Sequence, residues 1–520
     1  MEKNTIGAET LLAAVDLGSN SFRLEIAHCV GGQIQRVDYI KEAVRQGGDL
    51  DENRNLNAAA LERGVKCLER FGEALKGFPA QNVRAVATQT LREARNRQYF
   101  IDLAQKALGY NIEVISGVEE ARLIYQGVSH FLPQSDERRL VIDIGGRSTE
   151  FVLGQHFDAL QTESLRVGSV AWSLKYFPDG ELSEKNLKQA EVAAKSFLEV
   201  ITRSYSAKYW DVAYGASGTV GAVGDVLALA GFQEGVITRE GLDWLRKELI
   251  KAKNTTRLKL DGLKEERNAV IGGGFSVLRA VFDILKIETL HVARGALRHG
   301  LFYDMAAEAS DGLVYTKEAS IHLLLKRFPV DAKQAEHVNE AALYLFDLVT
   351  TNLKLKRSEI KAQRRLLSWA AQCHEIGAMI SHGESHLHGA YILDHTELMG
   401  FSQSDLHHLS LLVLGQRGKL KKLDLTQVDQ KLLIALTCLR LAIILCHSRN
   451  KPILSGIEHL QFNAEKMILT VWDAWLEKHP QTSYLLEEEV IAWKKVNWSL
   501  TITTKQKPKD VLTVDSVDMG

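Results

Sequence analysis

The sequence predicts an α/β protein whose first part is a duplicated lobe, followed by an all-α domain and a small C-terminal α+β piece. Strand-like and helix-like segments alternate through residues 1–310, as expected when helices cover the faces of a sheet. The stretch AVDLGSNSFRLEIA at 14–27 can be laid over VIDIGGRSTEFVLG at 141–154, which indicates an internal repeat. From about residue 320, long helical periodicity replaces the alternation.

The first lobe is predicted to span residues 1–135. LLAAVDLG and FRLEIAHCV are strand-like, an amphipathic helical stretch covers 58–75, and VRAVAT and IEVIS are strand-like again. The second lobe, 136–310, begins with the strand-like RLVIDIGG and EFVLG and continues through a predicted helix at 183–202 to DVAYGASGT. The two lobes therefore share one order of elements.

A helical domain is predicted over residues 311–450. IHLLLKRF, QAEHVNEAALYLFDLV, RLLSWAAQCHEIG, LHHLSLLVLG and LLIALTCLRLAIIL all have helical periodicity. In 451–520 the alternation in LSGIEHLQFNAEKMILTVWD and VNWSLTITT predicts strands again. Several domains also accord with the length of 520 residues, because one hydrophobic core rarely serves so long a chain.

Composition is typical of a folded protein from a reducing compartment. Hydrophobic residues make up 45% and charged residues 25%, and the five cysteines are widely spaced without a CxxC pair. The N-terminus has no basic segment followed by an apolar one. The most apolar stretch, 432–446, contains Arg440 and is shorter than the roughly 20 residues of a membrane span, so we expect a buried helix there. We therefore predict a cytoplasmic protein without a transmembrane segment; peripheral membrane association stays open.

Two matching loops are the first candidate for a functional site. In each, a strand delivers an Asp, the chain turns through Gly, and a hydroxyl residue follows before the next strand. Such turns expose consecutive N–H groups that suit phosphate oxygens, whereas a single such turn is usually a plain hairpin. The duplication, with Asp16 over Asp143, therefore predicts a phosphate site; the third loop, GASGT, is a weak signal alone. The predicted phosphate-binding residues are Gly18, Ser19, Asn20, Ser21, Gly145, Gly146, Arg147, Ser148, Ser217 and Thr219.

The second loop adds a carboxylate that the first lacks, because Glu150 stands where the first copy has Arg23. Asp143 and Glu150 are hard oxygen ligands of the kind that Mg²⁺ accepts, and Mn²⁺ is an alternative. Asp16 is expected to act behind these two ligands. The competing interpretation is that these carboxylates cap turns or pair with arginines.

Together these segments resemble the exopolyphosphatase and guanosine pentaphosphate phosphatase family, within the superfamily of duplicated actin-like and sugar-kinase-like (ribonuclease H-like) folds. The resemblance covers nearly the whole chain. It rests on AAVDLGSNSFRL, ATQTLREA, ISGVEEARLIYQGV, LVIDIGGRSTEFVLG, GASGT, EERNAVIGGGFSVL, GALRHGLFYD, WAAQCHEIG, SHLHGAYIL and LRLAIILCHSR.

The resemblance implies that Glu120, the second Glu of SGVEEA, is the catalytic base and that Arg92 of LREA binds phosphate. Residue chemistry alone does not choose Glu120. Adjacent helix positions point about 100° apart, so only one of Glu119 and Glu120 can face a given cleft, and Glu119 can pair with Arg122 at i,i+3. For Arg92 the competing interpretation is a solvated surface side chain.

Arg147 departs from the pattern of the family, which usually has Gly or Ala at this place in DIGGGSTE or DIGGASTE. Asn20 occupies the same place in the first loop, so a side chain is tolerable there. Beside a phosphate nest an arginine can add a bidentate contact, or it can obstruct the cleft.

The helical region resembles the HD-like module of the family, but His374-Glu375 replaces its metal-binding His-Asp pair. His337, His382, His386 and His388 are nearby in sequence, and we favour an interpretation without a second metal site. Two basic clusters predict either a polyphosphate track or merely solvated helix faces. The first, the predicted track, is Arg417, Lys419, Lys421 and Lys422; the second is Lys354, Lys356, Arg357, Lys361, Arg364 and Arg365.

The leading hypothesis is an exopolyphosphatase in which Mg²⁺ and Glu120 promote hydrolysis of the terminal phosphate of inorganic polyphosphate. The alternative in the same chemistry is a guanosine pentaphosphate (pppGpp) 5′-phosphohydrolase. A kinase of the same superfamily, suggested by VIGGGF, and a non-enzymatic polyphosphate or alarmone sensor are the other classes. The resemblance implies a homodimer, and with a net charge of −1 we expect no nucleic-acid partner.

Overall fold

The computed structural model describes residues 11–30, 33–133, 135–308, 312–351, 356–423, 429–463, 466–496 and 498–506. The chain forms two compact units, which are described separately. The first unit comprises Met1–Glu318 together with Glu397–Gln403, and the second comprises Ala319–Thr396 and Ser404–Gly520. The first unit therefore contains both predicted lobes, and the second contains most of the helical region with the C-terminal piece.

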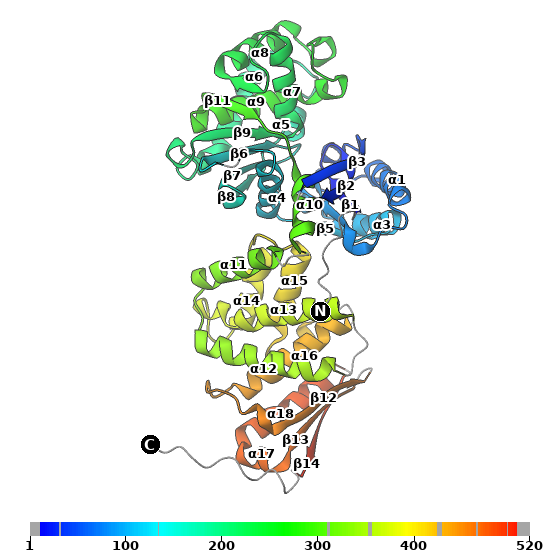
Figure 1. Ribbon diagram of the computed structural model, residues 1–520, viewed down its shortest axis with the longest axis vertical. Coiled ribbons are helices and arrows are strands. Elements are labelled where there is room, and N and C mark those ends of the chain that lie inside the picture. Colours follow the sequence, from blue (N-terminus) through cyan, green and yellow to red (C-terminus); the bar gives the residue numbers. More distant parts are fainter. Residues whose placement is uncertain are drawn as a thin grey trace. The chain divides into compact units, whose positions relative to one another are not determined.

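The first lobe is built on a five-stranded sheet with the order β3-β2-β1-β4-β5. Strands β1, β2 and β3 are antiparallel neighbours, whereas β4 and β5 continue parallel to β1. Figure 1 shows these strands in blue. The strands are β1 Leu11–Leu17, β2 Phe22–Val30, β3 Gln33–Glu42, β4 Val83–Ala87 and β5 Ile112–Val114.

The second lobe repeats this topology in a six-stranded sheet with the order β10-β11-β9-β6-β7-β8. Strands β8, β7, β6, β9 and β11 occupy the places of β3, β2, β1, β4 and β5, with β10 added at the edge. The predicted duplication is confirmed. The strands are β6 Arg138–Ile144, β7 Thr149–Gln155, β8 Asp158–Leu165, β9 Val212–Ala216, β10 Val236–Thr238 and β11 Thr289–Val292.

Helices divide the first unit into three hydrophobic cores. Helices α1 and α3 pack on one face of the first sheet, and α6, α8 and α9 pack in the second lobe. The third core joins apolar side chains of both sheets to helices α4 and α10, so α4 lies between the lobes. The helices are α1 Ala58–Ala74, α2 Gln89–Glu93, α3 Arg97–Leu108, α4 Gly117–Ser129, α5 Ser169–Tyr176, α6 Glu184–Leu198, α7 Ser217–Leu229, α8 Arg239–Ala252, α9 Asn268–Leu285 and α10 Leu297–Glu308.

One helical stretch in the described part of the chain, Glu265–Leu285, is long and apolar enough to cross a bilayer by length and composition. However, 67% of its apolar window is buried inside the protein, and the residues of α9 belong to the core of the second lobe. These features are typical of a core helix.

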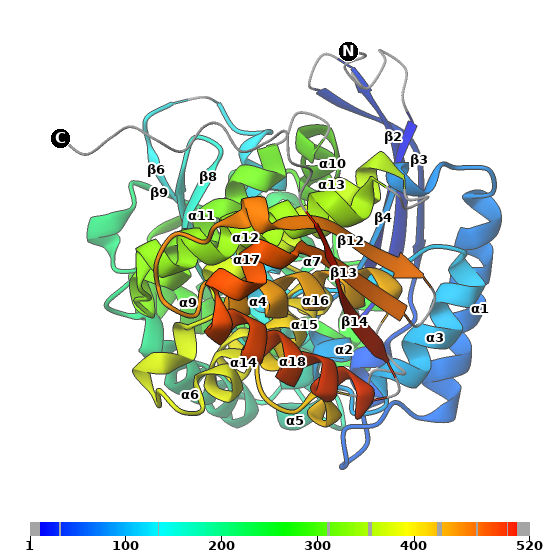
Figure 2. The same cartoon turned by 90° about the horizontal axis from the view of Figure 1, so that it is seen from below.

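The second unit is helical, with a three-stranded sheet at its C-terminal end in which β13 lies between β12 and β14 (Figure 2). The apolar stretch at 432–446 forms the buried helix that was predicted, and its Arg440 pairs with Glu489 of α18. The elements are α11 Gly312–Arg327, α12 Ala332–Thr350, α13 Arg357–Gln372, α14 Ser385–His395, α15 Gln403–Gly415, α16 Gln430–Leu445, β12 Ile457–Asn463, β13 Lys466–Trp472, α17 Asp473–Lys478, α18 Pro480–Lys494 and β14 Ser499–Lys505.

Two features differ from the sequence analysis. It identified no strands at β3, β8, β10 and β11. The edge strands β3 and β8 are largely polar and lack a strong apolar alternation, and β10 and β11 are only three and four residues long. It also placed 397–403 in the helical domain, but these residues belong to the first unit. There Ser402 forms a β-bridge with Ile115, and Gly400 donates a backbone hydrogen bond to the Glu119 carboxylate at 2.6 Å.

Candidate functional site

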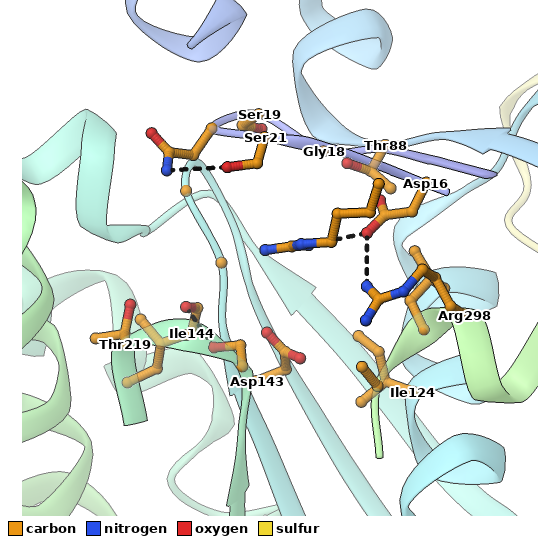
Figure 3. Close-up of a pocket in the computed structure, with 18 of the residues that line it drawn as sticks. Asp16, Gly18, Ser19, Ser21, Thr88, Ile124, Asp143, Ile144, Thr219 and Arg298 are labelled. Carbon is orange, nitrogen blue, oxygen red and sulfur yellow. Dashed lines mark hydrogen bonds and ion pairs between the residues drawn. The ribbon is translucent and has the colours of Figure 1, made fainter. Parts of the chain in front are cut away.

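A cavity of about 410 Å³ opens in the first unit, where the loops of both lobes meet. Figure 3 shows Ser19 and Ser21 of the first loop on one side and Asp143 and Thr219 on the other. Nine of the ten predicted phosphate-binding residues line the cavity, and Arg147 is the exception. The nine are Gly18, Ser19, Asn20, Ser21, Gly145, Gly146, Ser148, Ser217 and Thr219.

The two main loops touch each other and are tightly turned. A Cβ atom added to Gly146 would lie 3.0 Å from the Cβ of Ser19, which is closer than ordinary contact. The second turn is closed by the backbone N–H of Gly145, which donates to the Ser148 carbonyl at 2.9 Å. Close backbone approach of this kind leaves room for phosphate oxygens beside the exposed N–H groups.

The third loop carries a strained backbone. Ser217, the first residue of α7, has a φ of 75°, which is uncommon for a residue with a Cβ. Its hydroxyl donates to the Ile144 carbonyl at 2.8 Å and so ties this loop to the second one. Strain of this kind is concentrated at functional sites.

Glu120 enters the cavity from the first turn of α4. The helix begins at Ser116, whose hydroxyl accepts a hydrogen bond from the Glu119 N–H at 3.1 Å. Glu120 lines the cavity and is 8% exposed. Burial raises the pKa of its carboxyl, although the Arg92 guanidinium opposes the shift.

Arg92 lies directly behind this carboxylate. Its Nη1 donates to Glu120 Oε2 at 2.8 Å and to the Ile115 carbonyl at 3.0 Å. The buried Nη2 has no hydrogen-bond partner among the described residues. Arg92 itself is not among the residues that line the cavity, so its guanidinium acts on the cavity through the Glu120 carboxylate that it holds.

The expected difference between the two adjacent glutamates is confirmed. Glu119 points away from the cavity and accepts two hydrogen bonds from Arg122, each 2.8 Å long. Arg122 also bonds Asp304 of α10, with Nη1 at 3.0 Å from Oδ1. Glu119 therefore belongs to a buried structural ion network, and Glu120 is the one that faces the cavity.

Asp143 and Glu150 are direct cross-strand partners on β6 and β7. Asp143 lines the cavity, whereas Glu150 is 1% exposed and its Oε1 accepts from the Ser164 hydroxyl at 2.8 Å. Burial and the charge of Glu120 raise the pKa of Asp143 to about 7. Burial, with the charges of Glu120 and Asp143, raises the pKa of Glu150 well above its ordinary value.

The combined charge of Glu120, Asp143 and Glu150 favours a divalent cation such as Mg²⁺. Three buried carboxyl groups repel one another, so a divalent cation beside them would relieve the repulsion. No three His, Cys, Asp or Glu residues in the described ranges are placed to hold a metal ion by themselves. Mg²⁺ is commonly held by one or two carboxylates together with substrate phosphates, so the donor set is compatible with it.

For Asp16 the structure agrees with the competing interpretation, in which the carboxylate pairs with arginines. Its Oδ2 accepts from Arg23 Nη1 at 2.9 Å and lies 3.5 Å from Arg298 Nη1. Dashed lines in Figure 3 mark both contacts. Asp16 therefore orients two cations at the cavity wall.

The sequence analysis missed the cationic lining. Signals were present, because EERN and GALRHG were noted as motifs without roles for their arginines. Burial, together with the nearby charge of Arg23, lowers the pKa of Arg267. Arg267 is one of five cations that line the cavity. Together they suit a ligand with several phosphate charges. They are Arg23, Lys41, Lys264, Arg267 and Arg298.

Arg147 follows neither alternative proposed from the sequence. Its side chain is absent from the residues that line the cavity. Instead Nη2 and Nε bond Glu93 Oε2 at 2.7 and 3.1 Å, and Nη1 donates to the Gly47 carbonyl. The guanidinium therefore connects the second loop to the first lobe.

Among the histidines of the second unit, His374 has a backbone contact, whereas His337 Nδ1 and His386 Nδ1 are buried without a hydrogen-bond partner among the described residues. His374 Nδ1 lies 2.7 Å from the Ala371 carbonyl, and Glu375 pairs with Arg449. Burial lowers the pKa of His374.

The basic clusters also lie in the second unit. Arg417, Lys419 and Lys421 are exposed and line a cavity of about 590 Å³ together with acidic side chains. Lys422 is different, because it donates to the Arg417 carbonyl at 2.7 Å and burial lowers its pKa to about 8. In the second cluster, Arg364 pairs with Asp347. Lys354 lies outside the described residues.

Comparison with known proteins identifies the family of the chain. The profile of the Ppx/GppA phosphatase family matches residues 25–309, and that of Ppx/GppA phosphatase domain III matches 316–490. A guanosine-5′-triphosphate,3′-diphosphate pyrophosphatase of Aeromonas hydrophila is 37% identical over 94% of this chain and 98% of its own length. The protein of the same name from Vibrio cholerae is 38% identical over 95% and 98%.

Solved structures support the fold of the duplicated lobes. An exopolyphosphatase-like protein is 25% identical, with a TM-score of 0.52, over 57% of this chain and 98% of its own. An exopolyphosphatase from Cytophaga hutchinsonii is 23% identical, with a TM-score of 0.51, and covers the same shares. The predicted fold class is therefore confirmed. Because the family profiles and the full-length relatives agree, the chain belongs to the Ppx/GppA phosphatase family.

Proposed function

We propose that the protein is a guanosine-5′-triphosphate,3′-diphosphate pyrophosphatase, which removes the terminal 5′ phosphate of pppGpp. The observation that carries the proposal is a cavity lined by Glu120, two phosphate-type loops and five cationic side chains. The relatives that match nearly the whole chain carry this activity in their names. They support the alternative reading of the sequence better than its leading one, exopolyphosphatase.

In the proposed reaction, Glu120 accepts a proton from the attacking water. The water oxygen forms a bond to the terminal phosphorus, the bond to the bridging oxygen breaks, and the products are inorganic phosphate and ppGpp. A carboxylate with a raised pKa is a better base near neutral pH than an ordinary one. The loop N–H groups bind the oxygens on which charge is concentrated, and Arg92 holds the Glu120 carboxylate that faces them.

We propose that Asp143 and Glu150 help to hold Mg²⁺, or Mn²⁺ in its place. The supporting observation is the mutual repulsion of the buried carboxylates. When bound, the cation would neutralise part of the negative charge of the phosphate oxygens. A titration of phosphate release against Mg²⁺ tests this, with Asp143→Asn and Glu150→Gln expected to require more Mg²⁺. Unchanged titrations in both variants would exclude them as metal-holding residues.

The decisive experiment measures kcat/KM for pppGpp and for long-chain polyphosphate with one purified sample. We expect pppGpp to be the better substrate, and Glu120→Gln purified in parallel to show that a contaminating phosphatase is not responsible. A higher kcat/KM for polyphosphate would establish an exopolyphosphatase instead. Tight binding of either ligand without phosphate release would indicate a sensor.

A further inference from the structure

A continuous chain of hydrogen bonds connects the second phosphate loop to the catalytic carboxylate. Arg147 Nη2 donates to Glu93 Oε2 at 2.7 Å, and the other oxygen of Glu93 accepts from Gln89 Nε2 at 2.6 Å. Gln89 Oε1 in turn accepts from Arg92 Nε at 2.9 Å. Arg92 Nη1 then reaches Glu120 Oε2 at 2.8 Å. Each step joins two polar side chains through a good donor and acceptor pair.

The chain is shielded from water along most of its length. Gln89 is 4% exposed, and the side chains of Arg147 and Glu93 are 19% and 11% exposed. Ion pairs at such partly buried positions are screened less by solvent than surface pairs are. The side chains are therefore held in defined positions.

Arg147 also reaches the first phosphate loop. Its Nη1 donates to the Gly47 carbonyl, while the Gly47 N–H donates to the Ser19 carbonyl at 2.7 Å. The same guanidinium thus connects the second loop with the first loop and with helix α2. Gly or Ala at position 147 would have no side chain that could make either contact.

We propose that Arg147 is a positioning residue for hydrolysis: acting through Glu93 and Gln89, it sets the orientation of Arg92 and hence of Glu120. Arg92 is anchored on one edge by Gln89 and on another by the Ile115 carbonyl. These two contacts hold the guanidinium in the orientation in which Nη1 reaches Glu120. Without Arg147, Glu93 loses its charged partner and Gln89 loses its orientation, so Arg92 can turn away from Glu120.

This proposal rests on the proposed function only because its test requires a substrate from which the protein releases phosphate. The first variant is Arg147→Met, which keeps a long apolar stem but removes all hydrogen-bond donors. We expect kcat for pppGpp to fall by about 10- to 10²-fold, the effect of misplacing a catalytic group by about 1 Å. KM should change little, because Arg147 does not line the cavity. Arg147→Lys should recover part of the loss.

A double-mutant cycle separates this route from a general structural role. If Arg147 acts through Gln89, adding Arg147→Met to Gln89→Ala should cause little further loss of kcat, because the connection is already broken. Two independent roles would give losses that multiply. Arg138→Met is the matched control, since Arg138 pairs with Asp211 on the exposed surface of the same lobe.

A second variant guards against misfolding of Arg147→Met. Glu93→Gln leaves Arg147 in place and should also lower kcat with KM nearly unchanged. The inference alone is overturned if the wild type turns over pppGpp and both variants match its kcat, or if the losses in the cycle multiply. A wild type that releases no phosphate from pppGpp or polyphosphate would overturn the proposed function, and this inference with it.

Discussion

Glu120 has an acidic environment that is unusual for a carboxylate. Asp16 and Asp143 line the same cavity, Glu150 lies behind Asp143, and burial raises the pKa of Glu120 itself. Among the described residues, Arg92 supplies the compensating charge, with Nη1 at 2.8 Å from Glu120 Oε2. Burial and the neighbouring carboxylates therefore favour uptake of a proton by Glu120 even though Arg92 pairs with it.

Glu120→Gln should lower kcat for phosphate release by about 10²- to 10⁴-fold, the usual contribution of a positioned general base. The amide keeps the size of the side chain but cannot accept the proton. Binding of substrate, measured by calorimetry, should remain close to that of the wild type. Glu184→Gln, at an exposed position on α6, is the control. Turnover near the wild-type rate in Glu120→Gln would remove Glu120 from the mechanism.

Glu25 holds Arg298, one of the five cations that line the cavity. Its carboxylate bonds Arg298 Nε and Arg36 Nε, each at 3.0 Å. Burial alone would raise the pKa of Glu25, but hydrogen bonding and charge from His299, Arg298 and Arg36 lower it from 4.5 to about 2. Glu25 therefore stabilises the folded state above pH 4.5, and this contribution is lost as the pH falls to about 2.

We therefore expect the difference in stability between wild type and Glu25→Gln to depend on pH. Urea unfolding at several pH values should show a wild-type advantage near pH 7 that shrinks between pH 4.5 and about 2. A difference independent of pH in this window would mean that the carboxylate charge of Glu25 does not stabilise the fold.

At the scale of elements, helix α4 is held by a buried ion network. Asp304 of α10 accepts from Arg84 Nη1 of β4 and from Arg122 Nη1 of α4, each at 3.0 Å. The side chain of Asp304 is 3% exposed. Its removal would leave two buried guanidinium groups without their shared partner, which is costly even where an intact buried pair adds little.

We expect Asp304→Asn to lower the free energy of unfolding by about 3–5 kcal/mol, as measured by urea denaturation. Asp211→Asn is the matched control, because the Arg138–Asp211 pair is exposed and should contribute little. Similar small effects of both substitutions would contradict the role given to the network. A kcat for folded Asp304→Asn close to that of the wild type would show that the network stabilises α4 without adjusting Glu120.

At the scale of the whole molecule, the cavity proposed as the active site belongs to the first unit and the predicted polyphosphate track to the second. A linear polyanion bound by several cationic side chains releases counterions, so its affinity should fall steeply with salt. Changing Arg417, Lys419, Lys421 and Lys422 to Gln should flatten this dependence for long polyphosphate and leave pppGpp hydrolysis unchanged. An unchanged salt slope would mean that the cluster only solvates the surface. Light scattering on the same samples would test the expected homodimer.

Local patterns in the sequence determined much of this protein. The duplication and the loop register follow from a repeat that can be read directly. Helical geometry predicts that only one of Glu119 and Glu120 faces the cavity, and the spacing of Glu119 and Arg122 predicts their ion pair. The buried helix at 432–446 follows from an apolar run too short for a membrane. In each case the determining interactions join residues close in the chain, or copies of one motif.

Only the tertiary structure decided which distant side chains meet. Asp16 pairs with Arg298, and Arg147 pairs with Glu93. The Gly400 N–H donates to the Glu119 carboxylate, which is 281 residues away in the sequence. No local periodicity encodes these contacts, because a charged side chain has many acceptable partners and packing selects among them. The sequence analysis missed the five cations of the cavity for the same reason. They come from β2, β3, the segment before α9, and α10, and only folding brings them to one cavity.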